Sequence, residues 1–328
     1  MLRKINISIV MATYNGSKYI SEQLMSILGQ SVLPQEIVLV DDASYDNTID
    51  IVERILSESK IKYSIIQHEI NRGISQTFED GIKNANCEYV MICDQDDIWN
   101  REKIKETKRV IELYKDVVLA VCDADIVNEC LNSKKLTMFH NINLPLIFKN
   151  DYCILNQMQA IDLLLKRNYI TGMCMAVKRE IAIEAIPFSN NMTYDSWISW
   201  IAAQRGKIAF INKVLVLYRQ HENNAIGVKK SIYLLKGYNH RRMKRKSIIC
   251  KKYEDMYHSS KSDYARENSL NGYEFHLWRE SINKKKTIMG LIGILNHRFK
   301  GNYVKYSGNP MKELIKDVIE IILFRNVE

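Results

Sequence analysis

Short apolar runs alternate with amphipathic stretches along the first half of the chain. Between the runs, apolar residues recur at helical spacing, as in the stretch from Ile20 to Leu28 that Gly29 ends. The order β-α-β-α-β-α-β predicts an α/β fold with a mainly parallel sheet, right-handed crossovers and helices on both faces. Four runs have the length and β-forming content of buried strands: Ile5–Met11, Glu36–Val40, Tyr63–Gln67 and Glu88–Cys93.

The pattern is less regular after the fourth run. Val117–Cys122 predicts a fifth strand that ends before Asp123 and Asp125. Asn132–Tyr152 has no clear period and predicts a long loop of the kind that covers a substrate. A helix, an extended segment, a second helix and two strands are predicted next: Asn156–Arg167, Ile170–Val177, Ser196–Gly206, Lys207–Ile211 and Val214–Tyr218.

Polar side chains gather where three of the predicted strands stop. Because the carboxyl ends of parallel strands meet at one edge of a sheet, we expect a single cleft there. No G-x-G-x-x-G or G-x-x-x-x-G-K-[ST] motif accompanies these side chains, which disfavours dinucleotide and P-loop sites. The polar residues are Thr13 and Asn15 after the first strand, Asp41 and Asp42 after the second, and Asp94, Asp96 and Asp97 after the fourth.

The acidic segment after the fourth strand is the strongest candidate for chemistry. Carboxylates crowded at the end of a core strand repel one another unless a cation or hydrogen-bond donors neutralise them. A hard divalent ion held by one or two carboxylates, with its other positions open to a diphosphate, would do so. The alternative is that Asp94 and Asp97 only solvate a turn and cap the helix that begins near Asn100.

Charge divides the chain near residue 228. The 328 residues carry a net charge of +9. The segment from Lys229 to Glu328 alone, with 22 basic and 10 acidic residues, exceeds this charge, so the rest of the chain is slightly negative. The sequence therefore predicts a domain over residues 1–228 and a basic helical region over residues 229–328. Seven cysteines without a C-x-x-C pair indicate a reducing cytosol. We expect neither a signal peptide, because Met1–Ser8 has no apolar core, nor a membrane-spanning segment of roughly 20 residues.

The basic region suggests a polyanionic partner. Lys229–Lys252 holds ten basic residues and no acidic one, a pattern that suits nucleic acid or anionic lipid. Apolar residues between the basic ones favour a helix on an anionic membrane and disfavour nucleic acid. The alternative is a solvated face of a helix that packs on the main domain. A second amphipathic stripe lies between Leu314 and Leu323.

Seven short motifs lie along the predicted elements: IVMATYNG (9–16), VLVDDASYDNT (38–48), NRGI (71–74), YVMICDQDDIW (89–99), ITGMCMAV (170–177), YDSW (194–197) and YRQHENNAIG (218–227). Together, and in this order, they resemble family 2 glycosyltransferases, whose GT-A fold is a Rossmann-like nucleotide-sugar-binding fold. The resemblance covers about two thirds of the chain. The C-D-Q-D-D-I-W and Y-R-Q-H-x-x-N forms are most similar to the bacterial rhamnosyltransferase branch that builds capsule, O-antigen or cell-wall polysaccharide.

The resemblance implies a nucleoside pocket lined by Thr13, Tyr14, Asp41 and Asp42. Asp41 is favoured as the acceptor from the base N–H, and Arg72 matches a basic residue near the nucleotide. The structural alternative for Asp42 is that it only caps the following turn.

The resemblance also implies a D-x-D motif at Asp94-Gln95-Asp96. Asp94 would lie towards the ribose, and Asp96 would bind Mg²⁺ or Mn²⁺. His221 lies in a motif that in some relatives approaches the metal and the diphosphate, although it could simply form a hydrogen bond at a strand end.

Asp195 matches the catalytic base of the family. It would take the proton of the acceptor hydroxyl during a single inverting displacement, a contribution of ~10²–10⁴-fold. It could instead be an ordinary N-cap of the helix starting at Ser196. Relatives in this branch often have His where this chain has Tyr194, which leaves the hydrogen-bond partner of the base open.

The implied reaction moves a rhamnose-like or other hexose from a nucleoside diphosphate sugar to a hydroxyl of a saccharide or lipid-linked acceptor. We expect it in the cytoplasm, at the inner face of the cell membrane. Two other functions compete with this one. A sugar nucleotidyltransferase shares the fold class, but Ala12–Ser17 lacks the basic glycine-rich loop expected for it. A non-catalytic nucleotide-sugar-binding module is disfavoured by the intact Asp96 and Asp195.

Overall fold

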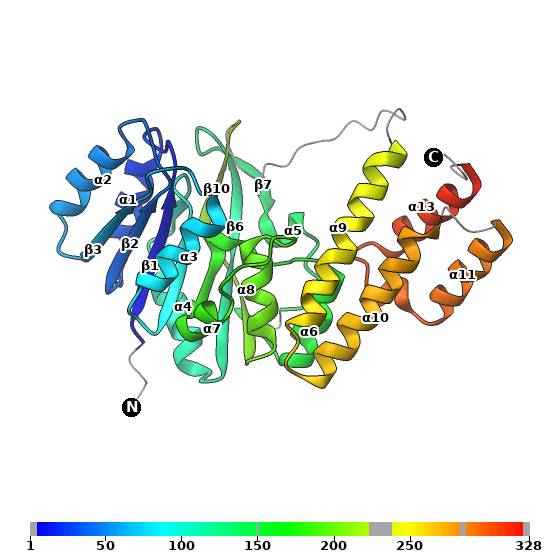
Figure 1. The fold of residues 1–328 in the computed structure, drawn as a ribbon. Coiled ribbons are helices and arrows are strands. Elements are labelled where there is room, and N and C mark those ends of the chain that lie inside the picture. The colour runs from blue at the N-terminus through cyan, green and yellow to red at the C-terminus, as the bar shows by residue number, and fades with distance from the viewer. Residues whose placement is uncertain (1–4, 149, 223–237, 283–286, 324–328) are drawn as a thin grey trace. The chain divides into compact units, whose positions relative to one another are not determined.

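The computed structural model describes residues 5–148, 150–222, 238–282 and 287–323 (Figure 1). The chain forms two compact units. Two short segments from within residues 1–228 belong to the second unit, which otherwise consists of the C-terminal region. The first unit comprises Met1–Gln157, Tyr169–Phe188 and Thr193–Gly227, and the second comprises Met158–Asn168, Ser189–Met192 and Val228–Glu328.

A ten-stranded sheet forms the first unit, in the order β3-β2-β1-β4-β9-β6-β10-β5, with β7 paired to β6 and β8 paired to β10. The long pairings β3-β2-β1-β4 and β6-β10 are parallel, as predicted. The short strand β9 runs antiparallel between β4 and β6. The strands are β1 (Ile7–Thr13), β2 (Glu36–Asp41), β3 (Lys62–Gln67), β4 (Tyr89–Cys93), β5 (Ile98–Trp99), β6 (Val117–Asn128), β7 (Ser133–Thr137), β8 (Tyr152–Leu155), β9 (Met175–Lys178) and β10 (Lys207–Gln220).

Helices cover both faces of this sheet (Figure 1). Right-handed crossovers place α1 and α2, which pack on each other, on one face, and α3 on the other. α3 approaches β1 closely because Gly81 has no side chain: a Cβ there would lie 2.4 Å from Val10 Cγ1. The helices of this unit are α1 (Ile20–Leu28), α2 (Thr48–Ser57), α3 (Ile74–Asn84), α4 (Lys103–Leu113), α5 (Met138–Asn141), α7 (Arg179–Glu184), α8 (Tyr194–Ala203) and the 3₁₀ turn η1 (Gly172–Cys174).

The predicted elements differ from the structure at several places. β6 runs on to residue 128, so Asp123 and Asp125 lie inside the strand and not after it. The two strands predicted between residues 207 and 218 are one strand, β10, whose register shifts between Ile211 and Val214 hid its continuity. The predicted loop over residues 132–152 contains β7 and α5. The helix predicted from Ser196 begins at residue 194.

The described part of the second unit is helical, as the sequence predicts. Ile282, Ile294 and Ile321 form a small apolar core, on which Trp278 and Leu314 pack. Among the described residues, no helix has the length and the apolar character needed to cross a membrane. The helices are α6 (Gln157–Lys166), α9 (Tyr238–His258), α10 (Asp263–Glu280), α11 (Thr287–Phe299), α12 (Asn302–Lys305) and α13 (Pro310–Leu323).

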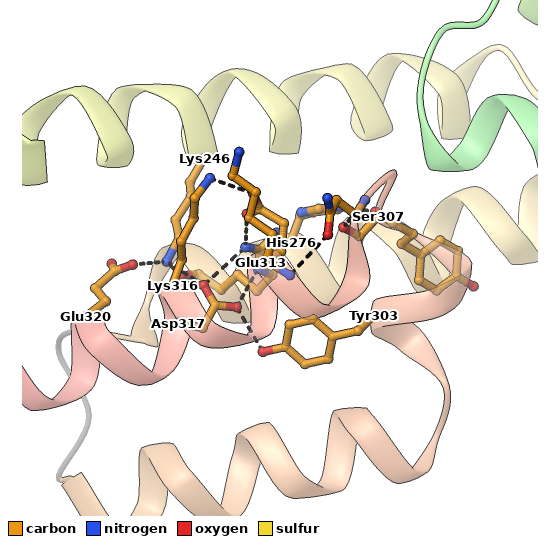
Figure 2. A network of polar contacts seen from close by, with 12 residues as sticks. Lys246, His276, Tyr303, Ser307, Glu313, Lys316, Asp317 and Glu320 are labelled. Atoms are coloured by element: carbon orange, nitrogen blue, oxygen red, sulfur yellow. Dashed lines mark hydrogen bonds and ion pairs between the residues drawn. The ribbon is translucent and has the colours of Figure 1, made fainter. Parts of the chain in front are cut away.

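A buried ionic network joins α9, α10 and α13 (Figure 2). The guanidinium of Arg279 donates from Nε to Asp317 at 2.7 Å and from a terminal nitrogen to Glu313 at 2.6 Å. Lys246 Nζ donates to Glu320 at 2.6 Å and to the carbonyl of Arg279 at 2.6 Å. The acidic side chains of α13 therefore point into the unit, where two buried cations neutralise them.

Candidate active site

The carboxyl ends of β1, β2 and β4 meet where the strand order reverses between β1 and β4, the usual ligand position in open α/β sheets. Thr13 Oγ1 donates to Asp41 Oδ1 at 2.8 Å, across the β1-β2 pair. Ser44 donates to Asp41 from its backbone N–H at 2.8 Å and from its hydroxyl at 2.5 Å. A carboxylate offers about four lone pairs, and within the described part of the chain Thr13 and Ser44 fill three of them on Asp41.

Asp42 binds the turn that precedes α3. Its carboxylate accepts from the backbone N–H groups of Arg72 at 2.7 Å and Gly73 at 2.8 Å, and His68 Nδ1 lies 2.8 Å away. Burial acts to raise the pKa of Asp42, but the hydrogen bonds from Arg72, His68 and Gly73 outweigh it and hold the pKa below its usual value. Asp42 thereby fixes the backbone at Arg72, whose side chain is half exposed.

Gln95 joins the loop after β4 to the loop after β1. Its side-chain amide donates to the carbonyl of Tyr14 at 3.0 Å and accepts from the N–H of Tyr14 at 2.9 Å. A Cβ at Gly16 would lie 2.1 Å from Gln95 Oε1, so only glycine allows this approach. The ring of Tyr14 stays exposed beside this bridge.

Four carboxylates form one electrostatic group beyond β4. Burial, and then the charges of Asp96 and Asp195, raise the pKa of Asp94 to about 7. Burial and the charges of Asp96 and Asp94 also raise the pKa of Asp97 well above its usual value, although the backbone N–H of Arg219 donates to it at 3.1 Å. The structure thus brings Asp195 close to the D-x-D segment, Asp94-Gln95-Asp96.

His221 lies directly against Asp96. Nε2 of His221 is 2.8 Å from Asp96 Oδ2, and both side chains are largely buried. The ring of Tyr19 packs on the imidazole with 4.6 Å between centroids. These contacts hold His221 beside Asp96 and so beside the acidic group.

Asp195 lies in the first turn of α8, so it is not the N-cap, which is Thr193. The hydroxyl of Thr193 and the N–H of Ser196 both donate to its Oδ1, the latter at 2.6 Å. Burial raises the pKa of Asp195 above its usual value, against these donors and the N–H of Gly172. The hydroxyl of Tyr194 lies against Gly172, where a Cβ would be 2.0 Å from it. The groups that donate to the Asp195 carboxylate include Thr193, Ser196 and Gly172.

Two cations that the sequence analysis did not single out support the site. Lys103 is fully buried, donates to the carbonyl of Met173 at 2.6 Å and lies 3.4 Å from the centroid of the Trp99 ring. The buried Arg219 donates from Nε to the carbonyl of Asp96 at 2.9 Å and pairs with Glu22. For Lys103, its helical spacing from the buried residues of α4 was the only available sequence signal.

The side chains of Asp96 and His221 suit a divalent ion that also binds water and phosphate oxygens. Among the described residues, no group of three or more His, Cys, Asp or Glu side chains is arranged to hold a metal ion. Asp96 and His221 offer two donors at most. That set is too small for a closed protein site, but it fits Mg²⁺ or Mn²⁺ completed by water and phosphate oxygens.

A doubly covered α/β sheet with an acidic group at its switch point is the arrangement expected of a GT-A glycosyltransferase. Two solved structures share this fold. The Staphylococcus aureus TarS 1–349 structure, in complex with UDP-GlcNAc, has a TM-score of 0.60 at 18% identity and covers 98% of this chain and 82% of its own. The mannosyltransferase PcManGT of Pyrobaculum calidifontis, in complex with GDP-Man and Mn²⁺, has a TM-score of 0.54 at 16% identity and covers 98% and 87%.

The chain belongs to glycosyl transferase family 2, whose family model matches residues 8–184. It is 30% identical to the dTDP-rhamnosyl transferase RfbG of Shigella flexneri over 239 residues, which is 66% of this chain and 73% of RfbG. It is 29% identical over 227 residues to an uncharacterized protein of Mycobacterium tuberculosis, and this match spans 69% of the chain but only 61% of that relative.

Proposed function

We propose that this glycosyltransferase catalyses an inverting, divalent-metal-dependent transfer of a hexose from a nucleoside diphosphate sugar to an acceptor hydroxyl. The observation that carries the proposal is the meeting of Asp195 with Asp94 and Asp96 at the switch point of the sheet. A base for the acceptor and acids for the donor diphosphate are needed within one site, and here separate segments of the chain supply them.

Asp195 accepts the proton of the acceptor hydroxyl as that oxygen attacks the anomeric carbon. Its raised pKa makes it a stronger base than a surface aspartate, which brings it closer to the operating pH. Thr193 and Ser196 fix the direction of the carboxylate before the acceptor arrives. One displacement, with no covalent intermediate on the protein, inverts the anomeric centre.

The nucleotide half of the donor lies along the ends of β1 and β2. Asp41 accepts from the base, and the exposed ring of Tyr14 contacts the nucleoside beside Thr13. Asp94 and Gln95 face the ribose, and Arg72 compensates phosphate charge from the turn that Asp42 holds. Each of these positions is supported by the shared edge of the sheet and by the motifs that match the family.

Asp96, with His221 beside it, holds Mg²⁺ or Mn²⁺ in this proposal. When bound, the ion supplies Lewis-acid stabilisation of the leaving diphosphate. Arg219 keeps the Asp96 segment in place through the carbonyl of Asp96. The carboxylates of Asp94 and Asp97, which burial makes costly as anions, are then compensated in the loaded site.

A rhamnose-like hexose is the favoured donor sugar, because a relative at 30% identity bears the name dTDP-rhamnosyl transferase. The acceptor is a saccharide or a lipid-linked saccharide of a bacterial surface polysaccharide such as capsule. The enzyme works in the cytoplasm at the inner face of the membrane, in peripheral contact with anionic lipid. No role in nucleic-acid binding is proposed.

The test is the release of nucleoside diphosphate from a panel of nucleotide sugars, with Mn²⁺, with Mg²⁺ or with EDTA, in the presence and absence of lipid-linked acceptors. Asp195→Asn should keep donor binding in calorimetry and lose about 10²–10⁴-fold in transfer. Asp96→Ala should lose the metal-dependent part of donor binding. Asp116→Asn, on an exposed carboxylate outside the site, is the matched control.

Three results would contradict the proposal. Near-normal turnover by Asp195→Asn would remove the base assignment. Release of pyrophosphate would identify a nucleotidyltransferase. Nucleotide-sugar binding without turnover of any donor or acceptor would identify a binding module.

A further inference from the structure

Helix α11 presents an apolar stripe to solvent. Ile288, Met289, Ile292, Leu295 and Phe299 are each between 53% and 87% exposed. Four of them recur at i, i+4, i+7 and i+11, so their side chains lie along one side of the helix. A stripe of this kind on a short helix is typical of a surface that is covered in use.

The opposite side of α11 is seated firmly in the second unit. Cβ atoms added at Gly290 and Gly293 would lie 2.8 Å from Ile321 and 2.6 Å from Trp278, and Ile294 is part of the apolar core. The helix is therefore held by one side alone. The exposed stripe on the other side does not pack in this core and can contact a lipid surface or another molecule.

Charges around the stripe favour an anionic partner. Residues 287–300 contain no acidic residue, and Arg298 and Lys300 are exposed at the end of the helix. On the neighbouring α13, the acids are turned inwards to Arg279 and Lys246, as Figure 2 shows for the labelled Asp317 and Glu320. The outward row of α13 is instead apolar and basic: Met311, Lys312, Ile315 and Ile319.

We propose that the α11 stripe inserts into the interface of an anionic lipid bilayer, with Arg298 and Lys300 at the level of the headgroups. This deepens the membrane contact of the proposed function by naming the element that makes it. The basic run at residues 229–252 was the expected element, and residues 229–237 of it lie outside the described residues. Within α9, however, Lys246 is buried in the ionic network and Tyr253 and Met256 pack inwards.

The full chain is mixed with vesicles of phosphatidylcholine alone or with phosphatidylglycerol added, and binding is measured by flotation at low and high salt. Wild type should float with anionic vesicles, and less so at high salt. The double variant Ile292→Asn/Leu295→Asn should bind about tenfold or more weakly. Met25→Asn/Leu113→Asn, at similarly exposed apolar positions on α1 and α4, is the matched control.

Charge and self-association are tested in parallel. Arg298→Gln should weaken binding to anionic vesicles about fivefold and leave the low binding to neutral vesicles unchanged. Circular dichroism and thermal unfolding verify that each variant is folded. Equal flotation of the α11 variant and its control, or no flotation of wild type, overturns the proposal. So does a dimer in light scattering that the α11 variant abolishes, because the stripe would then cover a second copy.

Nucleoside diphosphate release with a water-soluble acceptor keeps this proposal separate from the proposed function. The α11 variant should retain that activity, since the stripe lies outside the residues assigned to catalysis. Loss of flotation with retained release supports the lipid contact. Flotation that depends on α11 in a protein without transferase activity would refute the proposed function and leave the lipid contact intact.

Discussion

Asp94 carries an unusual protonation state for a carboxyl at the centre of the site. Burial and the nearby charges of Asp96 and Asp195 raise its pKa to about 7 from an ordinary value of 3.8. Between these two values the folded state binds a proton that the unfolded state does not. The stability contributed by Asp94 is therefore present at acidic pH and is lost as pH rises through about 7.

Asp94→Asn should remove this part of the pH dependence. With EDTA and without nucleotide, the Tm of wild type should fall by about 3–5 °C relative to the variant between pH 6 and pH 8, since one pKa unit corresponds to about 1.4 kcal/mol. Scanning calorimetry over this range measures it. Asp116→Asn should follow wild type, and parallel curves for wild type and Asp94→Asn would show that Asp94 is ionised throughout.

The charge of the buried Lys103 lowers the pKa values that burial raises for Asp94 and Asp97. Lys103→Met should reduce the free energy of unfolding by about 1–3 kcal/mol at pH 8, because the carbonyl of Met173 loses its donor. The loss should be smaller at pH 5, where Asp94 is protonated. Urea unfolding provides the measurement.

The matched control for this prediction lies on the same helix. Lys105→Met removes a lysine whose side chain is exposed and should change stability by less than about 0.5 kcal/mol. If Lys103→Met also changed stability by so little, the cost of burying the Lys103 charge would equal the stabilisation from its contacts.

At the scale of elements, prediction succeeded where one local pattern decided the outcome. The helix expected from Ile20 to Leu28 has those bounds, because its apolar period and Gly29 act within a few residues. The pattern failed at β10, where the bulge near Val214 reverses the period of two, and at η1, which the apolar run before β9 hid. Lys103 and Arg219 were missed because groups to which they donate, the carbonyl of Met173 and the carboxylate of Glu22, lie far away in sequence.

The close packing of α3 on the sheet allows a test of whether helix propensity or side-chain packing decides stability at Gly81. Gly81→Ala should improve helix propensity by about 1 kcal/mol, yet the added Cβ would lie 2.4 Å from Val10 and 3.3 Å from Val40. We expect a net loss of about 1–3 kcal/mol in urea unfolding, because overpacking a rigid sheet outweighs propensity. As a control, Ser75→Ala on the same helix should be neutral or slightly stabilising. A Gly81→Ala variant that is more stable than wild type would contradict the prediction and show that Val10 on β1 can move aside.

At the scale of the whole molecule, single carboxyl groups of the two units should respond to acid in opposite ways. Asp94 in the first unit contributes stability that is present at low pH. In the second unit, burial acts to raise the pKa of Glu313, but Arg279 and Lys316 outweigh it and lower the pKa to about 2. The stability that Glu313 contributes is therefore present above its ordinary pKa of 4.5 and is lost as pH falls towards 2. The ion pair of Glu313 with Arg279 thus makes the second unit less stable in acid.

His276 extends that sensitivity to milder acid. Histidine is often found at the surface in a basic, solvated helical region, but His276 is buried, packs on Tyr253 and lies 3.1 Å from the carbonyl of Tyr306. Burial, and then the charge of Arg279, lower its pKa to about 3. Between pH 3 and 6.5 the unfolded state binds the extra proton, so stability is lost as pH falls below 6.5.

His276→Gln should therefore flatten the acid response of the second unit. Wild type should lose about 2–3 kcal/mol between pH 7 and pH 4.5, whereas the glutamine can still donate to Tyr306 and does not titrate. Trp278 lies in the second unit and the other three tryptophans lie in the first, so the fluorescence difference between each protein and its Trp278→Phe counterpart follows this unit alone. His258→Gln, at an exposed position of α9, is the control and should keep the wild-type slope. If His276→Gln lost stability below pH 6.5 as steeply as wild type, the titrating group would have to be sought elsewhere in the unit.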